Sequence, residues 1–365
     1  MGNSDSNARE LVYKTELCGH TKSISMITHH NGKLYSASHD LTIRQWESES
    51  ALCINIFRGH SKFITAMVMS HDGIIYSGSG DGEIRSWAAE RQVALNVYKG
   101  HTKTITSLTL YDEFLFSGSF DHEIRQWHRT KSNCIQVYKG NEDIVTGIVV
   151  TGEFLYSSGA DKTLRKFSTK DGSCLLVMTG HTGWVWDLVV PNNDHVYSSS
   201  VDGTIRKWST DGKLMKVFSE ASDCVNRIAL ITHKNKNSLV ASSWDGCIRQ
   251  YDLSNDTLIH TMSGHASKIK SMIVVNHRVM ISGSEDHELR IWDLKNGSCQ
   301  YKLKLDTPVT SLCMGENNHV LYCANKSGAI RKYAIPKTRS SEKYLTSVDR
   351  RDEQTHYSTY ETSMF

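Results

Sequence analysis

One motif recurs about every forty residues along almost the whole chain and restricts the possible folds more than any other feature. Its form is Ser-x-x-x-Asp-x-x-(Ile/Leu)-Arg-x-aromatic, as in the segment from Ser77 to Trp87. Successive motif aspartates are 40 to 43 residues apart. In order, this position holds Asp40, Asp81, Asp121, Asp161, Asp202, Asp245, Asp286 and Ser327. The repeat predicts eight equivalent units instead of the two or three domains that 365 residues would otherwise suggest.

Within each unit, short alternating runs and turn residues predict four strands. A Gly-His pair stands about twenty residues before the motif aspartate in five units, Gly140-Asn141 replaces it in the fourth, and the sixth and eighth lack it. In the second unit the expected strands are Ile64 to Met69, Ile74 to Ser79, Glu83 to Trp87 and Val93 to Tyr98. Each unit is therefore expected to be a four-stranded antiparallel sheet.

This pattern resembles the WD-repeat family of β-propellers, in which Gly-His opens a repeat and Trp-Asp closes it. The resemblance covers about residues 11 to 335, although only Trp292-Asp293 keeps the full closing dipeptide. It implies an all-β fold, a single propeller of four-stranded antiparallel blades.

The number of blades depends on the outermost strand of the last unit. Seven repeats have an outer strand after the motif aromatic, but none follows Tyr333. Leu11 to Leu17 precede the first Gly-His in the register of an outer strand, and pairing them with the last unit would remove an exposed sheet edge. We therefore expect eight blades closed by the N-terminal strand, with seven blades as the alternative.

The resemblance also implies a buried hydrogen-bonded tetrad of His, Ser, Asp and Trp in each complete repeat. Five repeats hold all four residues, whereas the fourth, sixth and eighth do not and are expected to be the softest, because partly satisfied buried networks destabilise. The five sets are His20, Ser36, Asp40, Trp46; His60, Ser77, Asp81, Trp87; His101, Ser117, Asp121, Trp127; His181, Ser198, Asp202, Trp208; and His265, Ser282, Asp286, Trp292.

Composition and motif distribution argue against several functions. A formal net charge of +3 with interspersed charges gives no basic footprint for nucleic acid. A Ser, His and Asp together suggest a hydrolase, but five copies at fixed offsets fit a network that holds the fold, since a catalytic triad is needed once. No C-x-x-C pair is present. The sequence thus predicts a protein that is not an enzyme and has no metal and no cofactor.

Two further positions recur with the repeat. Four cysteines, Cys53, Cys134, Cys174 and Cys299, each follow a motif aromatic by seven residues, so they lie on different blades and are expected to act as small apolar core groups. An arginine fills the slot two residues before each motif aromatic in all eight units. We expect these arginines to pair between blades, with an anion-binding ring as the alternative.

Candidate binding residues come from family members that bind peptides, where contacts lie three and five residues after the Gly-His histidine and just before the turn aspartate. Applied to this sequence, these offsets predict an apolar arc with two lysines beside it that are suited to an acidic group. The alternative is that the arc packs over neighbouring loops. The predicted protein-binding rim is Phe63, Phe120, Ile144, Trp184, Trp186, Trp244, Lys268 and Lys270.

The chain ends lie outside the repeats. Residues 1–10 are expected to be a flexible N-terminus whose M-G-x-x-x-[ST] pattern makes Gly2 a candidate for myristoylation. Residues 11–336 form the propeller, and residues 337–365 read as a flexible polar tail whose last residues, Ser363 to Phe365, suit a PDZ-type groove. The N-terminus is too polar for a secretory signal, which favours the cytoplasm or the nucleus.

Together these features predict a non-catalytic scaffold or adaptor that binds peptide segments or partner proteins on the narrow top face of the propeller. We expect a monomeric propeller within larger complexes, with no nucleic acid and with membrane contact only if Gly2 is lipidated. The alternative is a targeting or regulatory module for a separate enzyme, a kinase or a ubiquitin ligase. Adaptors of ubiquitin ligases read phosphopeptides with several arginines at the rim, and this chain has none there.

Overall fold

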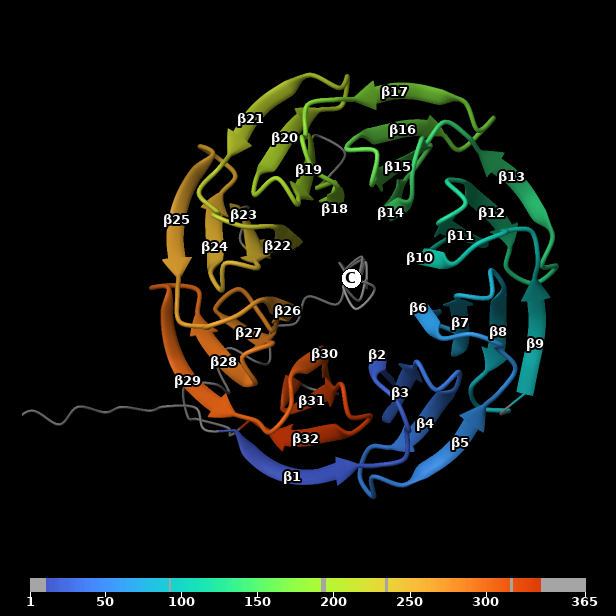
Figure 1. The fold of residues 1–365 in the computed structure, drawn as a ribbon, viewed down its shortest axis with the longest axis vertical. Helices are drawn as coiled ribbons and strands as arrows, with labels where there is room; N and C mark the ends of the chain where they lie inside the picture. Colours follow the sequence, from blue (N-terminus) through green and yellow to red (C-terminus); the bar gives the residue numbers. More distant parts are fainter. Residues whose placement is uncertain (1–10, 92, 192–194, 234–235, 316–317, 336–365) are drawn as a thin grey trace, which may run out of the picture.

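The computed structural model describes residues 11–335 except 92, 192–194, 234–235 and 316–317. These residues form eight four-stranded antiparallel sheets, arranged as blades around a central axis (Figure 1). Blades 1 to 7 each take four consecutive strands, beginning with β2 (Ile24–His30), and blade 8 combines three C-terminal strands with β1 (Val12–Leu17).

The strands occupy four concentric positions. The other innermost strands are β6 (Ile64–Met69), β10 (Ile105–Tyr111), β14 (Val145–Thr151), β18 (Val185–Val189), β22 (Val225–His233), β26 (Ile269–Val274) and β30 (Val309–Met314). The second strands are β3 (Lys33–Ser38), β7 (Ile74–Ser79), β11 (Phe114–Ser119), β15 (Phe154–Gly159), β19 (His195–Ser200), β23 (Lys236–Ser243), β27 (Val279–Ser284) and β31 (Val320–Asn325).

The third strands are β4 (Ile43–Glu47), β8 (Ile84–Ala88), β12 (Ile124–His128), β16 (Leu164–Ser168), β20 (Ile205–Ser209), β24 (Ile248–Asp252), β28 (Glu288–Asp293) and β32 (Ile330–Ala334). The outer strands, besides β1, are β5 (Cys53–Phe57), β9 (Val93–Tyr98), β13 (Cys134–Tyr138), β17 (Cys174–Met178), β21 (Leu214–Phe218), β25 (Thr257–Met262) and β29 (Ser298–Lys304).

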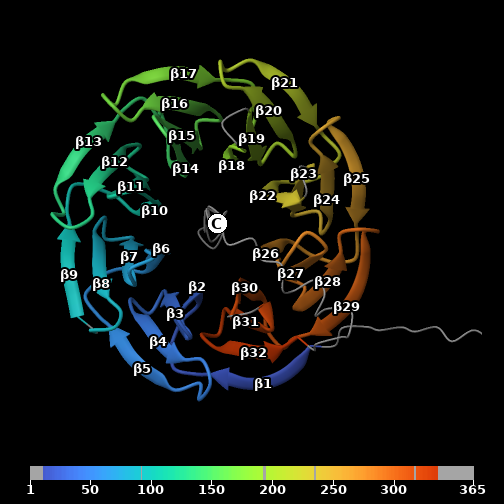
Figure 2. The same ribbon diagram turned by 180° about the vertical axis from the view of Figure 1, so that it is seen from behind.

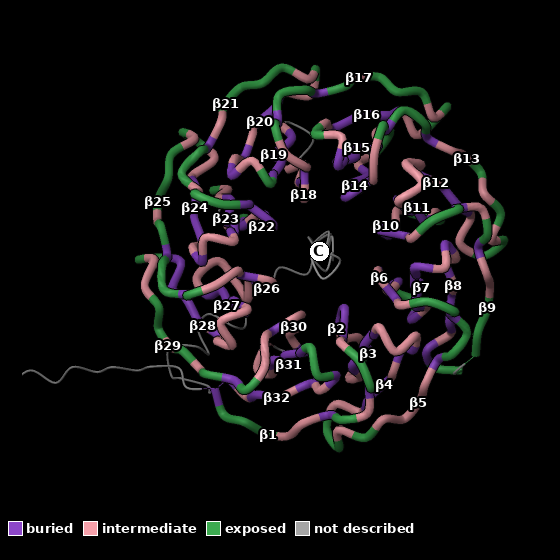
Figure 3. The backbone as a smooth tube through the Cα atoms, in the orientation of Figure 1, coloured by how far each residue is buried: buried purple, intermediate pink, exposed green. Residues whose placement is uncertain are grey.

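The degree of burial differs among the four strand positions of a blade. The second strands are buried on both faces because a neighbouring blade covers each side, and β7 reads Ile-Ile-Tyr-Ser-Gly-Ser with small residues where the next blade approaches. A Cβ on Gly78 would lie 2.4 Å from Ile105 of blade 3, so this close approach requires glycine. The outer strands face solvent on their convex side (Figure 3).

The hydrophobic core is divided into eight clusters, one at each interface between adjacent blades. In each cluster the motif aromatic of one blade packs against the preceding blade. Trp87 of blade 2, for example, lies in one cluster with Tyr35 and Phe57 of blade 1, and its ring centroid is 5.7 Å from that of Phe57. Since no blade buries its faces alone, the ring must close for the core to be complete.

The N-terminal strand closes the ring. β1 pairs antiparallel with β32, from Val12 opposite Ala334 to Leu17 opposite Ile330, and the two strands lie side by side in Figures 1 and 2. Blade 1 also bonds blade 8 directly, since the Ile27 amide donates to Ser311 Oγ over 3.3 Å. Eight blades with N-terminal closure are therefore confirmed, and the seven-blade alternative is wrong.

The prediction that the repeated cysteines are apolar core groups is wrong for Cys174 and Cys299, whereas Cys53 and Cys134 pack against core clusters. Cys174 and Cys299 are exposed, and Cys53 and Cys134 are half-buried, because their slot lies at the solvent-facing start of each outer strand. All nine cysteines of the chain are free thiols.

The described residues contain no helix that could span a membrane. The predictions for residues 1–10, including Gly2, and for the tail at 337–365 fall outside the described part of the chain.

Candidate functional site

The tetrads form one continuous hydrogen-bonded chain in each of five blades. In blade 3, Trp127 Nε1 donates to Ser117 Oγ over 2.8 Å, and Ser117 Oγ lies 2.8 Å from His101 Nε2. His101 Nδ1 in turn lies 2.8 Å from Asp121 Oδ2. The same three contacts, all between 2.7 and 3.0 Å, recur in blades 1, 2, 5 and 7.

The direction of the protons in this chain follows from its two ends. An indole N–H can only donate and a carboxylate can only accept, so Trp127 donates to Ser117 Oγ and His101 Nδ1 donates to Asp121, which leaves His101 Nε2 to accept from the Ser117 hydroxyl. His101 therefore carries its proton on Nδ1 and donates it to Asp121. Burial opposes ionisation of Asp121, but the bonds from His101 and from the amides of Thr102 and Glu123 outweigh it and lower its pKa to about 2.

Two of the tetrad histidines are held in the neutral form by burial. Burial lowers the pKa of His181 and of His265, even though an aspartate accepts from each ring. A Ser-His-Asp hydrolase would instead leave the serine hydroxyl open to substrate. Here each serine oxygen is fully buried beneath a tryptophan, so the arrangement holds each blade together.

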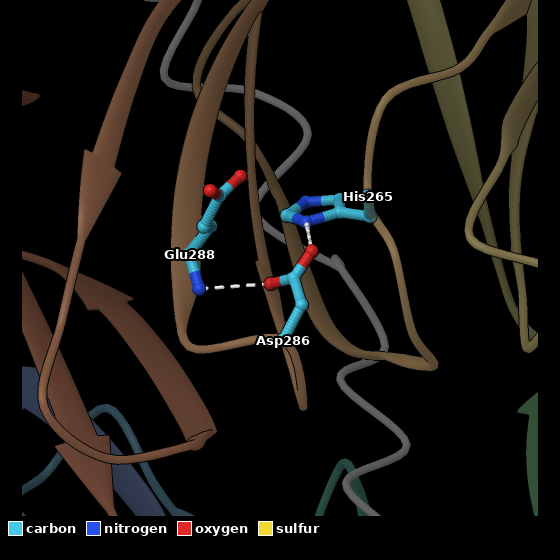
Figure 4. A group of neighbouring side chains, drawn as sticks. All are labelled: His265, Asp286 and Glu288. Carbon is cyan, nitrogen blue, oxygen red and sulfur yellow. Dashed lines mark hydrogen bonds and ion pairs between the residues drawn. The ribbon is translucent and has the colours of Figure 1, made fainter.

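Two residues of the blade 7 tetrad and a neighbouring glutamate form a cluster of side chains of the types that bind metals, shown in Figure 4. Atoms of His265, Asp286 and Glu288 lie within 4.8 Å of one another. Both ring nitrogens of His265 are already engaged, by Asp286 and Ser282, and Glu288 forms an ion pair of 2.7 Å with Arg290. These contacts make the cluster a part of the blade 7 network, and we assign no ion to it.

The repeated arginine compensates for the missing histidine in two of the incomplete blades. In blade 4, Asn141 accepts from Ser157 Oγ over 3.1 Å, while Arg165 pairs with Asp161. In blade 6, Arg249 pairs with Asp245 at 2.9 Å. The eighth blade has Asn325 in the turn, where its Oδ1 accepts from the Ser327 and Ala329 amides.

The expected inter-blade pairing of these arginines is wrong. Wherever an acidic partner is seen in blades 2, 3, 4, 6 and 7, it lies in the same blade, as with Glu83 for Arg85 at 2.7 Å. In blade 8, Arg331 pairs with Glu16 of β1 and with Asp306 in the loop before β30. The repeated arginine lies near the start of the third strand, beside the turn of its own blade. Its side chain therefore reaches an acid of that turn before one of the next blade.

The predicted rim positions lie at one end of the ring, at the loops that precede the innermost strands; we call this end the rim face. In seven blades one backbone bond joins two of the three predicted offsets, from the residue before the turn aspartate to the residue three after the Gly-His position. These bonds, 2.8 to 2.9 Å long, run from His39 to Ser23, Gly80 to Phe63, Phe120 to Thr104, Ala160 to Ile144, Val201 to Trp184, Trp244 to Cys224 and Glu285 to Lys268.

The remaining offset, five residues after the Gly-His position, joins neighbouring blades in four of the eight blades, whereas Ser25 in blade 1 bonds the Ala37 carbonyl of its own blade. Thr65 donates to the Ile105 carbonyl over 2.5 Å and Thr106 to that of Val145 over 2.6 Å. Thr146 and Asn226 bond the next blade in the same way. In blades 5 and 7 this linking slot holds Trp186 and Lys270 instead.

Two tryptophans pack together at the rim of blade 5, and a third follows on blade 6. The rings of Trp184 and Trp186 pack edge to face, 5.9 Å apart. Cys224 connects them to blade 6, since its thiol contacts the Trp186 indole and its carbonyl accepts from the Trp244 amide over 2.9 Å. Burial raises the pKa of this thiol to about 12, so it stays protonated and unreactive. All three tryptophans are half-buried.

The two predicted lysines lie beside this cluster. Lys268 Nζ is 3.9 Å from the ring centroid of Trp244, and Lys270 Nζ is 5.6 Å from it. Lys270 also pairs with Glu285 at 3.2 Å. The other members of the predicted arc lie on different blades: the Phe63 ring packs at a tilt against His39, with centroids 5.4 Å apart, and covers Gly80, whereas Phe120 and Ile144 are half-buried on blades 3 and 4.

Sequence reasoning did not select Cys224, Glu285, Lys326 and Val201, although all four occupy the predicted offsets. The predicted rim was chosen for large apolar residues. The charged residues Glu285 and Lys326, at the same offsets as the predicted residues, were the sequence signal that could have added them. Lys326 is 3.6 Å from Glu285, and Val201 is the most exposed apolar residue of the rim.

The family model described as "WD domain, G-beta repeat" matches residues 11–47, 51–88, 92–128, 132–168, 172–209, 212–252 and 256–293. The chain belongs to the WD-repeat family. Seven repeats are matched in sequence; the eighth blade consists of β30, β31 and β32, which follow the last match, and of β1, which lies in the first match. WD-repeat propellers are generally non-catalytic scaffolds for protein interactions.

Relatives among curated proteins are similar over short segments. Target of rapamycin complex subunit LST8 of Mus musculus is 32% identical over 30% of this chain and 34% of its own length. WD repeat-containing protein 89 homolog of Dictyostelium discoideum is 31% identical over 27% and 30%. Autophagy-related protein 16 of Arabidopsis thaliana is 24% identical over 29% and 21%. The chain thus spans a fifth to a third of the length of these relatives.

Two solved structures share the fold. A computationally designed protein, Ika8, superposes with a TM-score of 0.79 at 24% identity, over 90% of this chain and all of its own. The WD40 β-propeller domain of Doa1 gives a TM-score of 0.64 at 20% identity, over 90% of this chain and 98% of its own.

Proposed function

We propose that this WD-repeat protein is a non-catalytic adaptor, in the cytoplasm or the nucleus, that binds peptide segments or partner proteins on the rim face over blades 5 to 7. One observation carries the proposal: the slot whose side chain links neighbouring blades at Thr65, Thr106, Thr146 and Asn226 holds Trp186 in blade 5 and Lys270 in blade 7. Positions where a repeat departs from its own structural rule are where function is expected.

The chemistry of these positions suits a protein partner. Tryptophan combines a large apolar area with few rotatable bonds, which is why it is enriched among residues that dominate binding energy. The rim also holds its side chains on a rigid frame, since the backbone bonds at Trp184 and Trp244 fix both loops. A partner would therefore meet a preformed surface and lose little affinity to ordering of the adaptor.

A quantitative pull-down from cells tests the proposal. Trp186→Ala and Trp244→Ala should each remove most of the partners that wild type retains. Leu52→Ala is the control, because Leu52 is 64% exposed on the turn between β4 and β5, at the opposite face. Thermal unfolding shows whether each variant is folded. Unchanged partners on folded tryptophan variants would refute the rim assignment.

The alternative role as a targeting module for a kinase or a ubiquitin ligase depends on the motif at Gly2. Mass spectrometry of the native N-terminus decides it. A myristoylated Gly2 would support membrane targeting, whereas a retained Met1 would exclude it.

A further inference from the structure

The rim face carries a surplus of positive charge at one place only among the predicted offsets of the described blades. Lys268, Lys270 and Lys326 lie around a single acid, Glu285, and we call these four residues the basic corner. Glu285 contacts Lys270 at 3.2 Å and Lys326 at 3.6 Å. Three lysines and one glutamate give 3 − 1 = +2 formal charges at the boundary of blades 7 and 8.

Lys268 is the lysine of this corner that no carboxylate contacts in the described part of the chain. Its ammonium lies 3.9 Å over the ring of Trp244, an arrangement in which the ring quadrupole attracts the cation without neutralising it. The backbone holds it there, since the Glu285 amide donates to the Lys268 carbonyl over 2.9 Å. The charge is thus placed beside an apolar surface rather than in open solvent.

Burial makes the positive charge of the neighbouring Lys270 sensitive to a partner. The Lys270 side chain is only 13% exposed, and burial together with the neighbouring lysines lowers its pKa despite Glu285. A second anion would offset part of that penalty, because it attracts the Lys270 ammonium and reduces the repulsion from the neighbouring lysines. An uncharged or basic partner would leave it in place.

We propose that the basic corner binds an aspartate or glutamate side chain of a peptide whose neighbouring apolar side chain lies against Trp184, Trp186 and Trp244. This inference rests on the proposed function and adds the chemistry of the partner: an acidic residue next to an aliphatic or aromatic one. Lys268 is the principal contact for the carboxylate, and the tryptophans bind the apolar side chain.

Selection from a random peptide display library on the full-length protein tests the inference. We expect enriched peptides to carry Asp or Glu beside an apolar residue, and their affinity to fall severalfold between 0.1 and 0.5 M NaCl. Enriched peptides without an acidic preference would overturn the inference and leave the proposed function standing. A library from which wild type enriches no peptide would overturn the proposed function itself.

A double-mutant cycle then assigns the contact. Lys268→Met keeps the stem over Trp244 and removes the charge, and we expect it to weaken a selected peptide about tenfold. Replacing the peptide glutamate by glutamine should weaken wild type equally and Lys268→Met hardly at all. Lys103→Met, an exposed lysine on the same face in blade 3, is the control and should change nothing. Additive effects of the two changes would overturn the assignment of Lys268, and tighter binding of a phosphoserine peptide would overturn the choice of a carboxylate.

Discussion

Arg249 and Asp245 form an ion pair of 2.9 Å in blade 6, where the repeat has lost its tetrad histidine. In blade 2, by contrast, the equivalent Arg85 pairs with Glu83, because His60 already occupies Asp81. In blades 4 and 6, where the histidine is absent, the arginine of the repeat thus takes over as the partner of the turn aspartate. This replacement of histidine by arginine explains how the incomplete tetrads of blades 4 and 6 still hold the turn aspartate in place.

The two arginines should therefore differ in their effect on stability. Arg249→Met leaves Asp245 without its cation in a largely buried site, which should lower the free energy of unfolding by roughly 3 kcal/mol. Arg85→Met removes a partly exposed pair and leaves Asp81 bonded to His60, so its cost should stay below about 1 kcal/mol. Urea unfolding of both variants measures the difference. Equal losses in the free energy of unfolding would contradict the role of Arg249 as the replacement partner of Asp245.

Two adjacent serines in blade 5 test the tetrad. Ser198 accepts from Trp208 and bonds His181, so Ser198→Ala leaves two buried nitrogens without partners and should cost about 2 to 4 kcal/mol. Ser199 is equally buried, but its hydroxyl has no partner among the described residues. Ser199→Ala should therefore change stability by less than about 0.5 kcal/mol. A reversed order in urea unfolding would refute the network.

The free energy of unfolding should decrease in two stages as the pH is lowered. The pKa values of His181 and His265 in the fold lie below the ordinary value of 6.5, so between these values the unfolded chain binds more protons than the folded one. Stability is full above pH 6.5 and declines as the pH falls below it. The stability from Asp121, with its pKa of about 2 against an ordinary 3.8, is present above pH 3.8 and is lost below that.

Chemical denaturation between about pH 2 and 8 measures both stages. His181→Asn, which copies the solution of blade 4, should make the decline between pH 6.5 and 5 shallower. A wild-type stability that stays constant from pH 7 to 5 would contradict the neutral, buried state of these histidines.

Deletion of residues 1–17 removes the strand that closes the ring. Leu17 is 1% exposed and Leu11 is 7% exposed, so losing both should cost about 3 to 6 kcal/mol and uncover the edge of β32. We expect a lower Tm and concentration-dependent light scattering. Deletion of residues 1–10 keeps β1 and is the control. If the two truncations unfold alike, β1 does not stabilise the ring.

The repeat made most of the fold predictable. The strands β6, β7 and β9 begin and end where the alternating runs predicted, because turn residues and period-two patterning both mark the boundaries. Closure by β1 was also predictable, since an unpaired edge on blade 8 had one available strand. Both inferences depend on backbone pairing, which the repeat fixes in the same way in every blade.

Side-chain partners were less predictable. Arg249 can reach an acid at several positions, and its choice depends on whether a histidine already holds the aspartate. Cys174 was predicted in the core because its slot recurs on different blades, yet outer strands have no further blade to cover them, and Leu175 and Val177 are exposed beside it. The offsets predicted where rim residues lie, but the pairing of Lys268 with Trp244 depends on how two blades meet.

The central claim, that partners bind at the rim face of blades 5 to 7, is tested most directly by site-specific photo-crosslinking in cells. A photoreactive phenylalanine analogue replaces either Val201 at the rim or Leu258 on β25 at the perimeter, two side chains of nearly equal exposure at 40% and 39%. We predict discrete crosslinked partners from position 201, lost when Trp244→Ala is added, and none from position 258. Crosslinks from position 258 alone, or crosslinks from position 201 that persist in Trp244→Ala, would contradict the account.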